Sequence, residues 1–175
     1  WAFAIWDNKK KKFFLSRDRF SEKPLYYFQE VDGFYFGSEI KVIQSLMPKK
    51  LEINYDHLKR YLVYGYRFLY KTSETYFHGI KEIEDASNAT VDYDLNFAQS
   101  KYWVPKSEIN PMSMDEAVEG TKHHLLESVK LRLRADVPLA FCLSGGVDSA
   151  SLASIAKKVF NYDVATFSII DSDNR

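Results

Sequence analysis

The stretch Phe-Cys-Leu-Ser-Gly-Gly-Val-Asp-Ser-Ala-Ser-Leu-Ala-Ser-Ile-Ala-Lys-Lys, residues 141–158, places two glycines between an apolar run and a helical pattern. The apolar run over residues 137–143 has the length of a buried strand, and residues 150–160 carry small and apolar side chains on one helical face. A second apolar run covers residues 164–170. The order strand, loop, helix, strand predicts a βαβ unit over residues 137–170 with parallel strands, whose carboxyl ends are where such units bind ligands.

The glycine pair at positions 145 and 146 admits two interpretations. In the first, the glycines only turn the chain, and Asp148 or Ser149 caps the following helix. In the second, the main-chain N–H groups at a helix N-terminus form an anion site, because no side chain covers them. Phosphate is the expected ligand of such a site.

Three well-known loops do not fit this stretch. A Walker A loop requires a lysine, and none follows Gly146. A Rossmann loop requires a third glycine at the helix entry, and a nucleophile elbow requires glycine on both sides of Ser144. What remains is a loop in which the hydroxyls of Ser144 and Ser149 bind pyrophosphate while Asp148 offers a hard oxygen ligand to Mg²⁺.

Composition narrows the class of protein further. The 175 residues are 46% hydrophobic, which suffices for a packed core, and 24 Lys and Arg balance 24 Asp and Glu. A formal net charge of zero gives no global attraction to nucleic acid or to an acidic membrane surface. Cys142, the single cysteine, lies in an apolar run and is predicted to be a buried, inert thiol, which fits a reducing cytoplasm.

The first hundred residues predict a strand-rich domain with an aromatic core. A hairpin is expected at the start, an antiparallel meander after it, then two helices, of which the second exposes His57, then a loop and further short strands. These elements are assigned in order to residues 1–6, 13–16, 24–28, 34–38, 38–46, 57–65, 66–80 and 80–93.

The second part of the chain follows a segment with linker character. Residues 99–112 contain two prolines, and Ser113 with Glu116 forms a capping box that opens a helix running to about residue 134. Its apolar positions predict one buried stripe, made of Val118, Leu125, Val129 and Leu133. The chain begins at Trp1 inside a strand-like run and ends just after another, so both ends are expected to be cut from a longer protein.

The loop Ser-Gly-Gly-Val-Asp-Ser, residues 144–149, resembles the PP-loop of ATP pyrophosphatases, enzymes that cleave ATP between the α and β phosphates. By itself the loop leaves several synthetases and tRNA-modifying enzymes open. Five further segments, in the same chain order, are similar to glutamine-hydrolysing asparagine synthetases. They are Arg17-Asp-Arg-Phe-Ser-Glu-Lys-Pro-Leu-Tyr-Tyr, Phe36-Gly-Ser-Glu-Ile-Lys, Gly79-Ile-Lys-Glu-Ile, Lys101-Tyr-Trp and Ser128-Val-Lys-Leu-Arg-Leu-Arg-Ala-Asp-Val-Pro.

This resemblance implies an α+β part followed by an α/β part. Residues 1–103 would belong to an N-terminal-nucleophile glutaminase, a four-layer αββα sandwich present here in part. Residues 104–112 would be the linker, and residues 113–175 would start a parallel-sheet PP-loop domain of the adenine nucleotide α-hydrolase type. The implied reaction is amidation of aspartate to asparagine through β-aspartyl-AMP, with release of pyrophosphate and ammonia from glutamine.

The resemblance also implies roles for single residues. Ser144, Gly145, Gly146, Asp148 and Ser149 match the pyrophosphate loop, with Asp148 as a magnesium ligand, and the adenosine would be bordered by Leu143 and Ile169. Asp18 matches the carboxylate that holds the amino group of glutamine. Without the resemblance, the default interpretation of Asp18 is a structural ion pair with Arg17 or Arg19.

Some positions depart from the family pattern. The glutaminase nucleophile is an N-terminal cysteine that this chain lacks, so no catalytic residue is assigned and the chain alone is expected to be inactive. Ser21 stands where glycine is usual, and Glu84-Asp85-Ala-Ser-Asn replaces the usual Leu-Pro-Pro-Gly-His. The expected partners are ATP, aspartate and glutamine, without nucleic acid or membrane, and a homodimer is compatible with the pattern.

Two other functions fit the same motifs. One is a related amidotransferase of a biosynthetic cluster that acts on a sugar or peptide carboxylate. The other is a nucleotide-binding module without catalysis.

Overall fold

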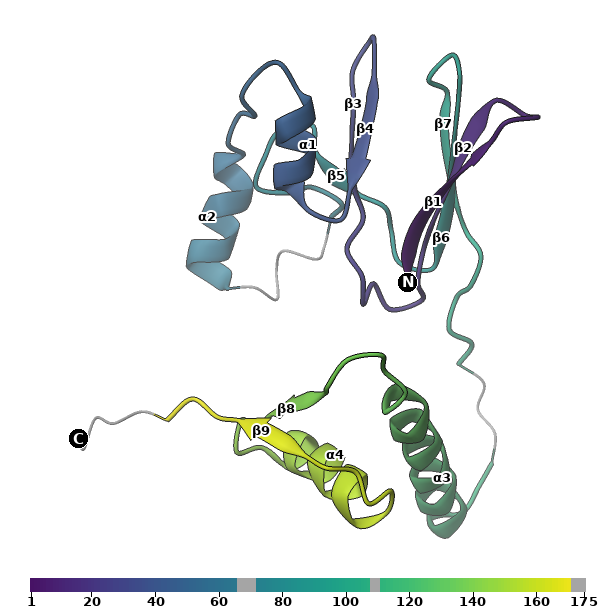
Figure 1. Ribbon diagram of the computed structural model, residues 1–175, viewed down its shortest axis with the longest axis vertical. Coiled ribbons are helices and arrows are strands. Elements are labelled where there is room, and N and C mark those ends of the chain that lie inside the picture. Colours follow the sequence, from purple (N-terminus) through teal and green to yellow (C-terminus); the bar gives the residue numbers. More distant parts are fainter. Residues whose placement is uncertain (66–71, 108–110, 171–175) are drawn as a thin grey trace. The chain divides into compact units, whose positions relative to one another are not determined.

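Figure 1 shows the computed structural model, which describes residues 1–65, 72–107 and 111–170. The chain divides into two units, Trp1–Ser107 and Glu108–Arg175. Among the described residues, no helix has both the length and the apolar character needed to cross a bilayer.

Two antiparallel sheets form most of the first unit. The larger sheet has the strand order β1-β2-β6-β7, built from β1 (Ala2–Asp7), β2 (Lys12–Arg17), β6 (Ser87–Asp92) and β7 (Phe97–Lys101). The smaller sheet has the order β4-β3-β5, built from β3 (Tyr26–Gln29), β4 (Phe34–Gly37) and β5 (Lys81–Glu82). The predicted hairpin and meander are therefore present, with boundaries shifted by one or two residues.

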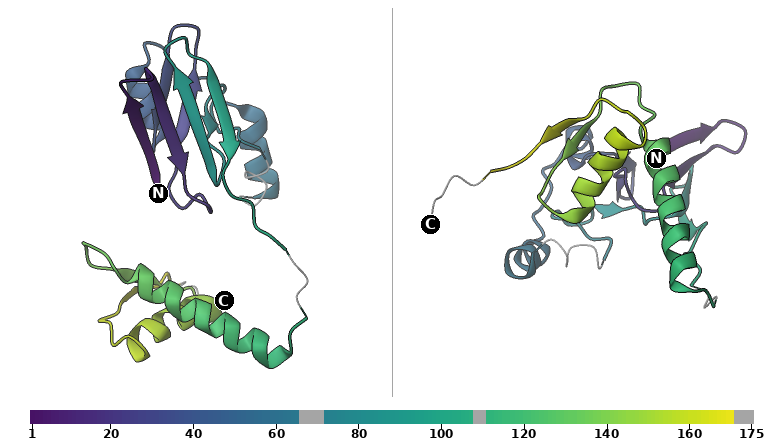
Figure 2. Two further views of the ribbon diagram at one scale, coloured as in Figure 1. Left: turned by 90° about the vertical axis from the view of Figure 1, so that its right-hand side faces the viewer. Right: turned by 90° about the horizontal axis from the view of Figure 1, so that it is seen from below.

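Helices α1 (Ile40–Leu46) and α2 (Tyr55–Tyr64) lie on the side of the smaller sheet that faces away from the larger one, as Figures 1 and 2 show. A first core fills the space between the sheets and a second fills the space under α1. The first contains Leu15, Leu25, Ile83, Ala89 and Val91, and the second Phe28, Ile43, Met47 and Ile80. Three layers therefore stack in the order sheet, sheet, helix.

Aromatic rings pack against both cores, as their position in alternating strands predicted. Tyr27 stacks on Phe34 and on Phe97, with ring centroids 5.5 and 4.7 Å apart. Phe13 meets Phe36 edge-on across the two sheets at 5.4 Å. These contacts hold the two sheets face to face.

Strand β7 was not expected, because residues 99–101 were assigned to the linker-like stretch. A tight turn after β6 brings the chain back: Asp92 Oδ1 accepts hydrogen bonds from the N–H groups of Asp94 and Asn96, and Leu95 has φ 63°. Such an Asx turn reverses a chain without glycine. The predicted loop at residues 66–80 lies partly outside the described residues, and its described part contains two isolated β-bridges, Ile53 to Phe77 and Glu74 to Lys81.

The second unit contains the predicted βαβ arrangement. Helix α3 (Met114–Arg132) opens with the capping box of Ser113 and Glu116, and then β8 (Ala140–Cys142), α4 (Val147–Lys158) and β9 (Ala165–Phe167) follow. Strands β8 and β9 pair in parallel, with Cys142 opposite Phe167. The strands are shorter than predicted, and α4 begins three residues earlier.

Two burial predictions for the second unit are wrong. Of the apolar stripe on α3, only Val129 is buried, whereas Val118 and Leu125 are 54% and 38% exposed. Cys142 is exposed as well. Alternation along β8 leaves Phe141 half-buried and turns Ala140 and Cys142 to the other face of a two-stranded sheet. Burial here depends on how many elements cover a face, which a local pattern does not report.

His57 was expected at the surface but is buried, with 3% of its area exposed. Helix α2 begins with Asn54 as its cap, which fixes the helix so that the His57 ring meets Tyr76 edge-on at 5.0 Å. Burial lowers the pKa of His57 below its ordinary value of 6.5, and the positive charge of Arg60 lowers it further, against the opposite effect of Glu74 and Glu82.

We therefore predict a pH-dependent stability of the first unit that His57 controls. Since folding favours the neutral ring, the unfolded state binds more protons between the folded pKa and 6.5, so stability is complete above that range and falls on acidification. The slope is about 1.4 kcal/mol per pH unit at most. Urea unfolding between pH 5.5 and 8 measures it.

His57→Phe should remove this slope while keeping the ring contact with Tyr76. His78→Gln is the matched control, because His78 is exposed. An identical slope in both variants would refute the assignment.

Candidate functional site

The pyrophosphate loop predicted from the sequence lies at the carboxyl edge of the β8–β9 pair. Leu143 donates its N–H to the carbonyl of Phe167 over 2.8 Å, so the chain after β8 and the chain after β9 leave the sheet together. Ile169 follows two residues after β9 and is fully exposed. The structure thus brings Leu143, the loop of residues 144–149 and Ile169 to one edge, where βαβ units bind ligands.

Hydrogen bonds within the loop hold its two serines together. The Oγ atoms of Ser144 and Ser149 are 3.2 Å apart, and Ser149 Oγ donates to the carbonyl of Gly146 over 3.1 Å. The N–H groups of Gly146 and Ser144 point at Ser144 Oγ and Ser149 Oγ over 3.4 and 3.3 Å. Gly145 has φ 81°, a conformation that glycine adopts without strain. These hydrogen bonds and the backbone of Gly145 fix the shape of the loop.

The simple capping interpretation of the loop is wrong. Helix α4 starts at Val147 with Gly146 as its N-cap, and no side chain caps it. Asp148 and Ser149 lie inside the first turn, where Asp148 is exposed. The N–H groups of a first turn have no intrahelical acceptor and carry the positive end of the helix dipole. This end of α4 therefore suits an anion.

Among the described residues that follow β8 and β9 at this edge, Asp148 is the one with a carboxylate for a magnesium ion. No three His, Cys, Asp or Glu side chains group together for a metal within the described ranges. Mg²⁺ is commonly held by one or two carboxylates together with substrate phosphates, so Asp148 fits a metal that arrives with a nucleotide.

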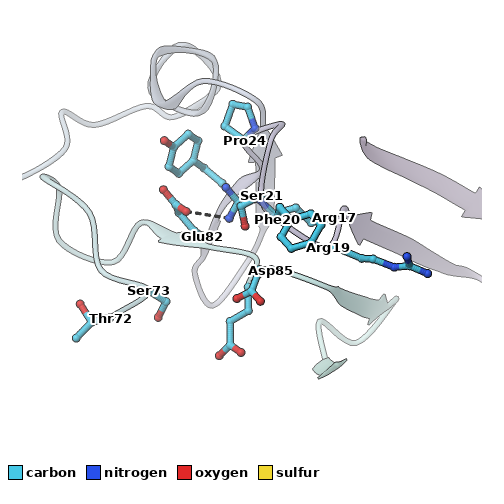
Figure 3. Close-up of a pocket in the computed structure, with 11 residues that line it drawn as sticks. Arg17, Arg19, Phe20, Ser21, Pro24, Thr72, Ser73, Glu82 and Asp85 are labelled. Carbon is cyan, nitrogen blue, oxygen red and sulfur yellow. Dashed lines mark hydrogen bonds and ion pairs between the residues drawn. The ribbon is translucent and has the colours of Figure 1, made fainter. Parts of the chain in front are cut away.

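The first unit contains a cavity of about 880 Å³ (Figure 3), and the residues on both sides of Asp18 in the sequence, Arg17 and Arg19, line it. Its wall combines the end of β2, the loop after it, β5 and the segment after β5. The lining residues include Arg17, Arg19, Phe20, Ser21, Glu82 and Asp85. Arg17 is buried and forms an ion pair with Glu82 over 2.8 Å, and its Nη1 also donates to the carbonyl of Ile83 over 2.6 Å.

Asp18 is buried next to this cavity, and main-chain groups surround its carboxylate. Oδ1 accepts from the N–H groups of Phe20 and Glu22, both over 3.0 Å. Oδ2 accepts from the main-chain nitrogens of Lys23 and Trp1 over 3.1 and 3.0 Å. Burial alone raises its pKa, but the hydrogen bonds from Glu22, Trp1, Lys23 and Phe20 outweigh burial and hold the pKa far below its ordinary value.

The alternative interpretation of Asp18, a structural ion pair with Arg17 or Arg19, is wrong. Arg17 pairs with Glu82, and Arg19 lies over the ring of Trp103. Four hydrogen bonds to main-chain nitrogens favour a structural role for Asp18, in which it shapes the loop of residues 19–23. Its predicted role as a ligand for the amino group of glutamine stays a prediction.

Sequence reasoning did not select Glu82, His57 or Trp103. The ion pair of Glu82 joins residues 65 positions apart, and no local pattern reports such a contact. Glu82 and Trp103 each carried one signal, because they belong to the Gly79-Ile-Lys-Glu-Ile and Lys101-Tyr-Trp segments. A second, smaller cavity of about 120 Å³ adjoins His57, Thr75 and Glu82.

Comparison with known proteins defines the class. Residues 1–103 match the family model described as glutamine amidotransferase domain, and residues 120–172 match the model described as asparagine synthase. The chain belongs to the glutamine amidotransferase domain family.

The similar proteins are more specific. The chain is 34% identical to "Asparagine synthetase [glutamine-hydrolyzing] 3" of Bacillus subtilis, over 99% of this chain and 28% of that protein. It is also 34% identical to "Putative asparagine synthetase [glutamine-hydrolyzing] 2" of Methanocaldococcus jannaschii, over 97% of this chain and 33% of that protein. An amidase of Gibberella zeae is 32% identical over 88% of this chain and 22% of that protein. The resemblance to glutamine-hydrolysing asparagine synthetases is confirmed, and the chain spans a third or less of these relatives.

The position of Ser21 generates a first prediction for the site. Ser21 has φ 53°, which costs a residue with a Cβ about 1–2 kcal/mol. Ser21→Gly should raise the free energy of unfolding by about 1 kcal/mol, after the greater freedom of glycine in the unfolded chain is subtracted. Ser38→Gly is the control, because Ser38 is an exposed loop residue whose φ is not positive. Equal destabilisation of both variants in urea unfolding would contradict the prediction.

The Asp18 carboxylate generates a second prediction. Asp18→Asn removes the charge and places an NH₂ group against N–H donors, so it should cost about 3 kcal/mol in the free energy of unfolding. Because the folded pKa is lowered, the wild-type advantage is present above the ordinary value of 3.8 and is lost as the pH falls below it. Asp85→Asn, at an exposed carboxylate, should change stability little. A cost for Asp18→Asn no greater than that of the control would exclude the structural role.

Proposed function

We propose that this chain is part of a glutamine-hydrolysing asparagine synthetase, a carbon–nitrogen ligase of asparagine biosynthesis. The observation that carries the proposal is the Ser144–Ser149 loop at the carboxyl edge of parallel strands, inside residues that match the asparagine synthase model. The first unit, in the glutamine amidotransferase family, supplies the matching half of the reaction.

In this proposal the second unit binds ATP. The hydroxyls of Ser144 and Ser149 and the open end of α4 bind the β and γ phosphates, while Leu143 and Ile169 border the adenosine. Gly145 and Gly146 keep side chains away from the phosphates. Mg²⁺ bound to the phosphates would neutralise their charge, and Asp148 would hold it from the protein side.

The proposed reaction has two steps, the formation of β-aspartyl-AMP and its reaction with ammonia. The side-chain carboxylate of aspartate attacks the α phosphorus and forms β-aspartyl-AMP, and the bond to pyrophosphate breaks. Donors that meet the pyrophosphate stabilise the charge that develops on it during this step. Ammonia from glutamine displaces AMP and leaves asparagine.

The domain assignment belongs to the same proposal. Residues 1–103 form part of the glutaminase domain, an αββα sandwich of which three layers are described, residues 104–112 are the linker, and residues 113–175 belong to the PP-loop synthetase domain. Asp18 is the candidate ligand for glutamine. Cys142 ends β8 beside the pyrophosphate loop and is not the glutaminase nucleophile. A cytoplasmic location and a homodimer remain predictions.

The proposal predicts that the full-length protein releases pyrophosphate from ATP only with aspartate, and forms asparagine with glutamine or ammonia. Ser149→Ala removes the residue that makes three of the hydrogen bonds inside the loop and should lower kcat/KM for ATP about a hundredfold. Ser154→Ala, an exposed serine further along α4, is the matched control and should be neutral.

The alternatives give different outcomes in a pyrophosphate assay. Release without aspartate, but with a sugar or peptide carboxylate, identifies an amidotransferase with another acceptor. ATP binding in calorimetry without any pyrophosphate release identifies a module without catalysis. Either result overturns the proposed function.

A further inference from the structure

Two successive aromatic residues after β7 attach the outgoing chain to the wall of the 880 Å³ cavity. Tyr102 Oη donates to the carbonyl of Arg17 over 2.9 Å, and the N–H of Tyr102 donates to the carbonyl of Ala86 over 2.8 Å. These bonds fix the direction in which the chain leaves the larger sheet. They also place the next residue, Trp103, against the loop that follows β2.

Trp103 touches two side chains that line the cavity. The guanidinium carbon of Arg19 lies 5.2 Å from the centroid of the indole ring, and the ring of Phe20 meets the indole edge-on, with centroids 5.6 Å apart. A cation over an aromatic face and two rings that meet edge to face are both favourable contacts. Phe20 is 71% exposed, so its position depends on the few groups that it touches.

Different groups hold the backbone and the side chains of the loop that follows β2. The main chain of residues 20–23 is held by the Asp18 carboxylate, whereas Arg19 and Phe20 are held from outside by Trp103. Trp103 is half-buried and does not itself line the cavity. Its loss should therefore release two wall side chains while the backbone of the loop keeps its shape.

We propose that Trp103 is a positioning residue for the glutamine-dependent half of the reaction: it holds Arg19 and Phe20 in the cavity wall and ties that wall to the chain leaving β7. The inference rests on the proposed function. Trp103 acts through the two side chains that it touches, and its indole ring couples the cavity wall to the outgoing chain beside the hydrogen bond from the Tyr102 hydroxyl to Arg17.

The test uses four variants of the full-length protein: Trp103→Ala, Trp103→Phe, Arg19→Ala and the double variant Arg19→Ala/Trp103→Ala. Trp6→Ala is the control for loss of an indole, because Trp6 packs on Phe13 in the first hairpin and lines neither cavity. Asparagine synthesis is measured with glutamine and, separately, with ammonia. Hydrogen exchange of the Phe20, Glu22 and Lys23 amides and thermal unfolding are followed in parallel.

Trp103→Ala should lower kcat/KM for glutamine about tenfold and leave ammonia-driven synthesis within about twofold, as loss of one cation–π and one ring contact predicts. Trp103→Phe should recover most of the loss, because it keeps an aromatic face. The double variant should be no worse than Trp103→Ala alone. Amide protection at the Asp18 bonds should be unchanged.

Three results would overturn the inference. Equal losses with glutamine and ammonia, or loss of amide protection, would make Trp103 a purely structural residue. Additive losses in the double variant would show that Arg19 and Trp103 act independently. Absence of ammonia-driven synthesis in the unmodified protein would instead refute the proposed function, and the exchange data would still report on the contact.

Discussion

Asp18 joins the end of β2 to three other segments of the first unit through hydrogen bonds to main-chain groups. Its carboxylate accepts from the nitrogens of Trp1, Phe20, Glu22 and Lys23, and its carbonyl accepts from Ser21 and Ala86. An ionised carboxylate without partners would be costly at this depth, so the surrounding N–H groups are the condition for its burial. The wall of the large cavity takes its shape from this arrangement.

The same arrangement explains why Ser21 occupies an unfavourable conformation. Three N–H groups within six residues converge on one carboxylate only if the chain curls tightly, and the curl places Ser21 at φ 53°. The strain of about 1–2 kcal/mol is smaller than the gain from hydrogen bonds to a charged acceptor, about 1.5–3 kcal/mol each. Glycine would adopt the same geometry without this strain.

Local signals in the sequence sufficed for the order of the elements in the second unit and for part of the first unit. The capping box at Ser113 and the strand, loop, helix, strand order over residues 137–170 depend on neighbours within a few positions, and the structure contains both of them. The prediction of burial failed for residues whose burial depends on elements far away in the sequence. His57 lies on a helix with a surface-like pattern, yet Tyr76 contacts it and it is buried. Cys142 lies in an apolar run, yet it is on the exposed face of β8.

The two candidate sites differ in how their residues are brought together, and this decides what the sequence reveals of each. The pyrophosphate loop is a continuous run of six residues at the end of one strand, so its composition already indicates anion binding. The cavity of the first unit depends on contacts between residues 65 to 85 positions apart, Arg17 with Glu82 and Arg17 with Tyr102. Such contacts follow from strand order, because β2 and β5 border the same cavity from different sheets. A sequence motif therefore identifies residues of this wall without giving their roles. Asp18 shows the difference: the resemblance marks it as a ligand, whereas in the structure its carboxylate accepts hydrogen bonds that fix the loop after β2.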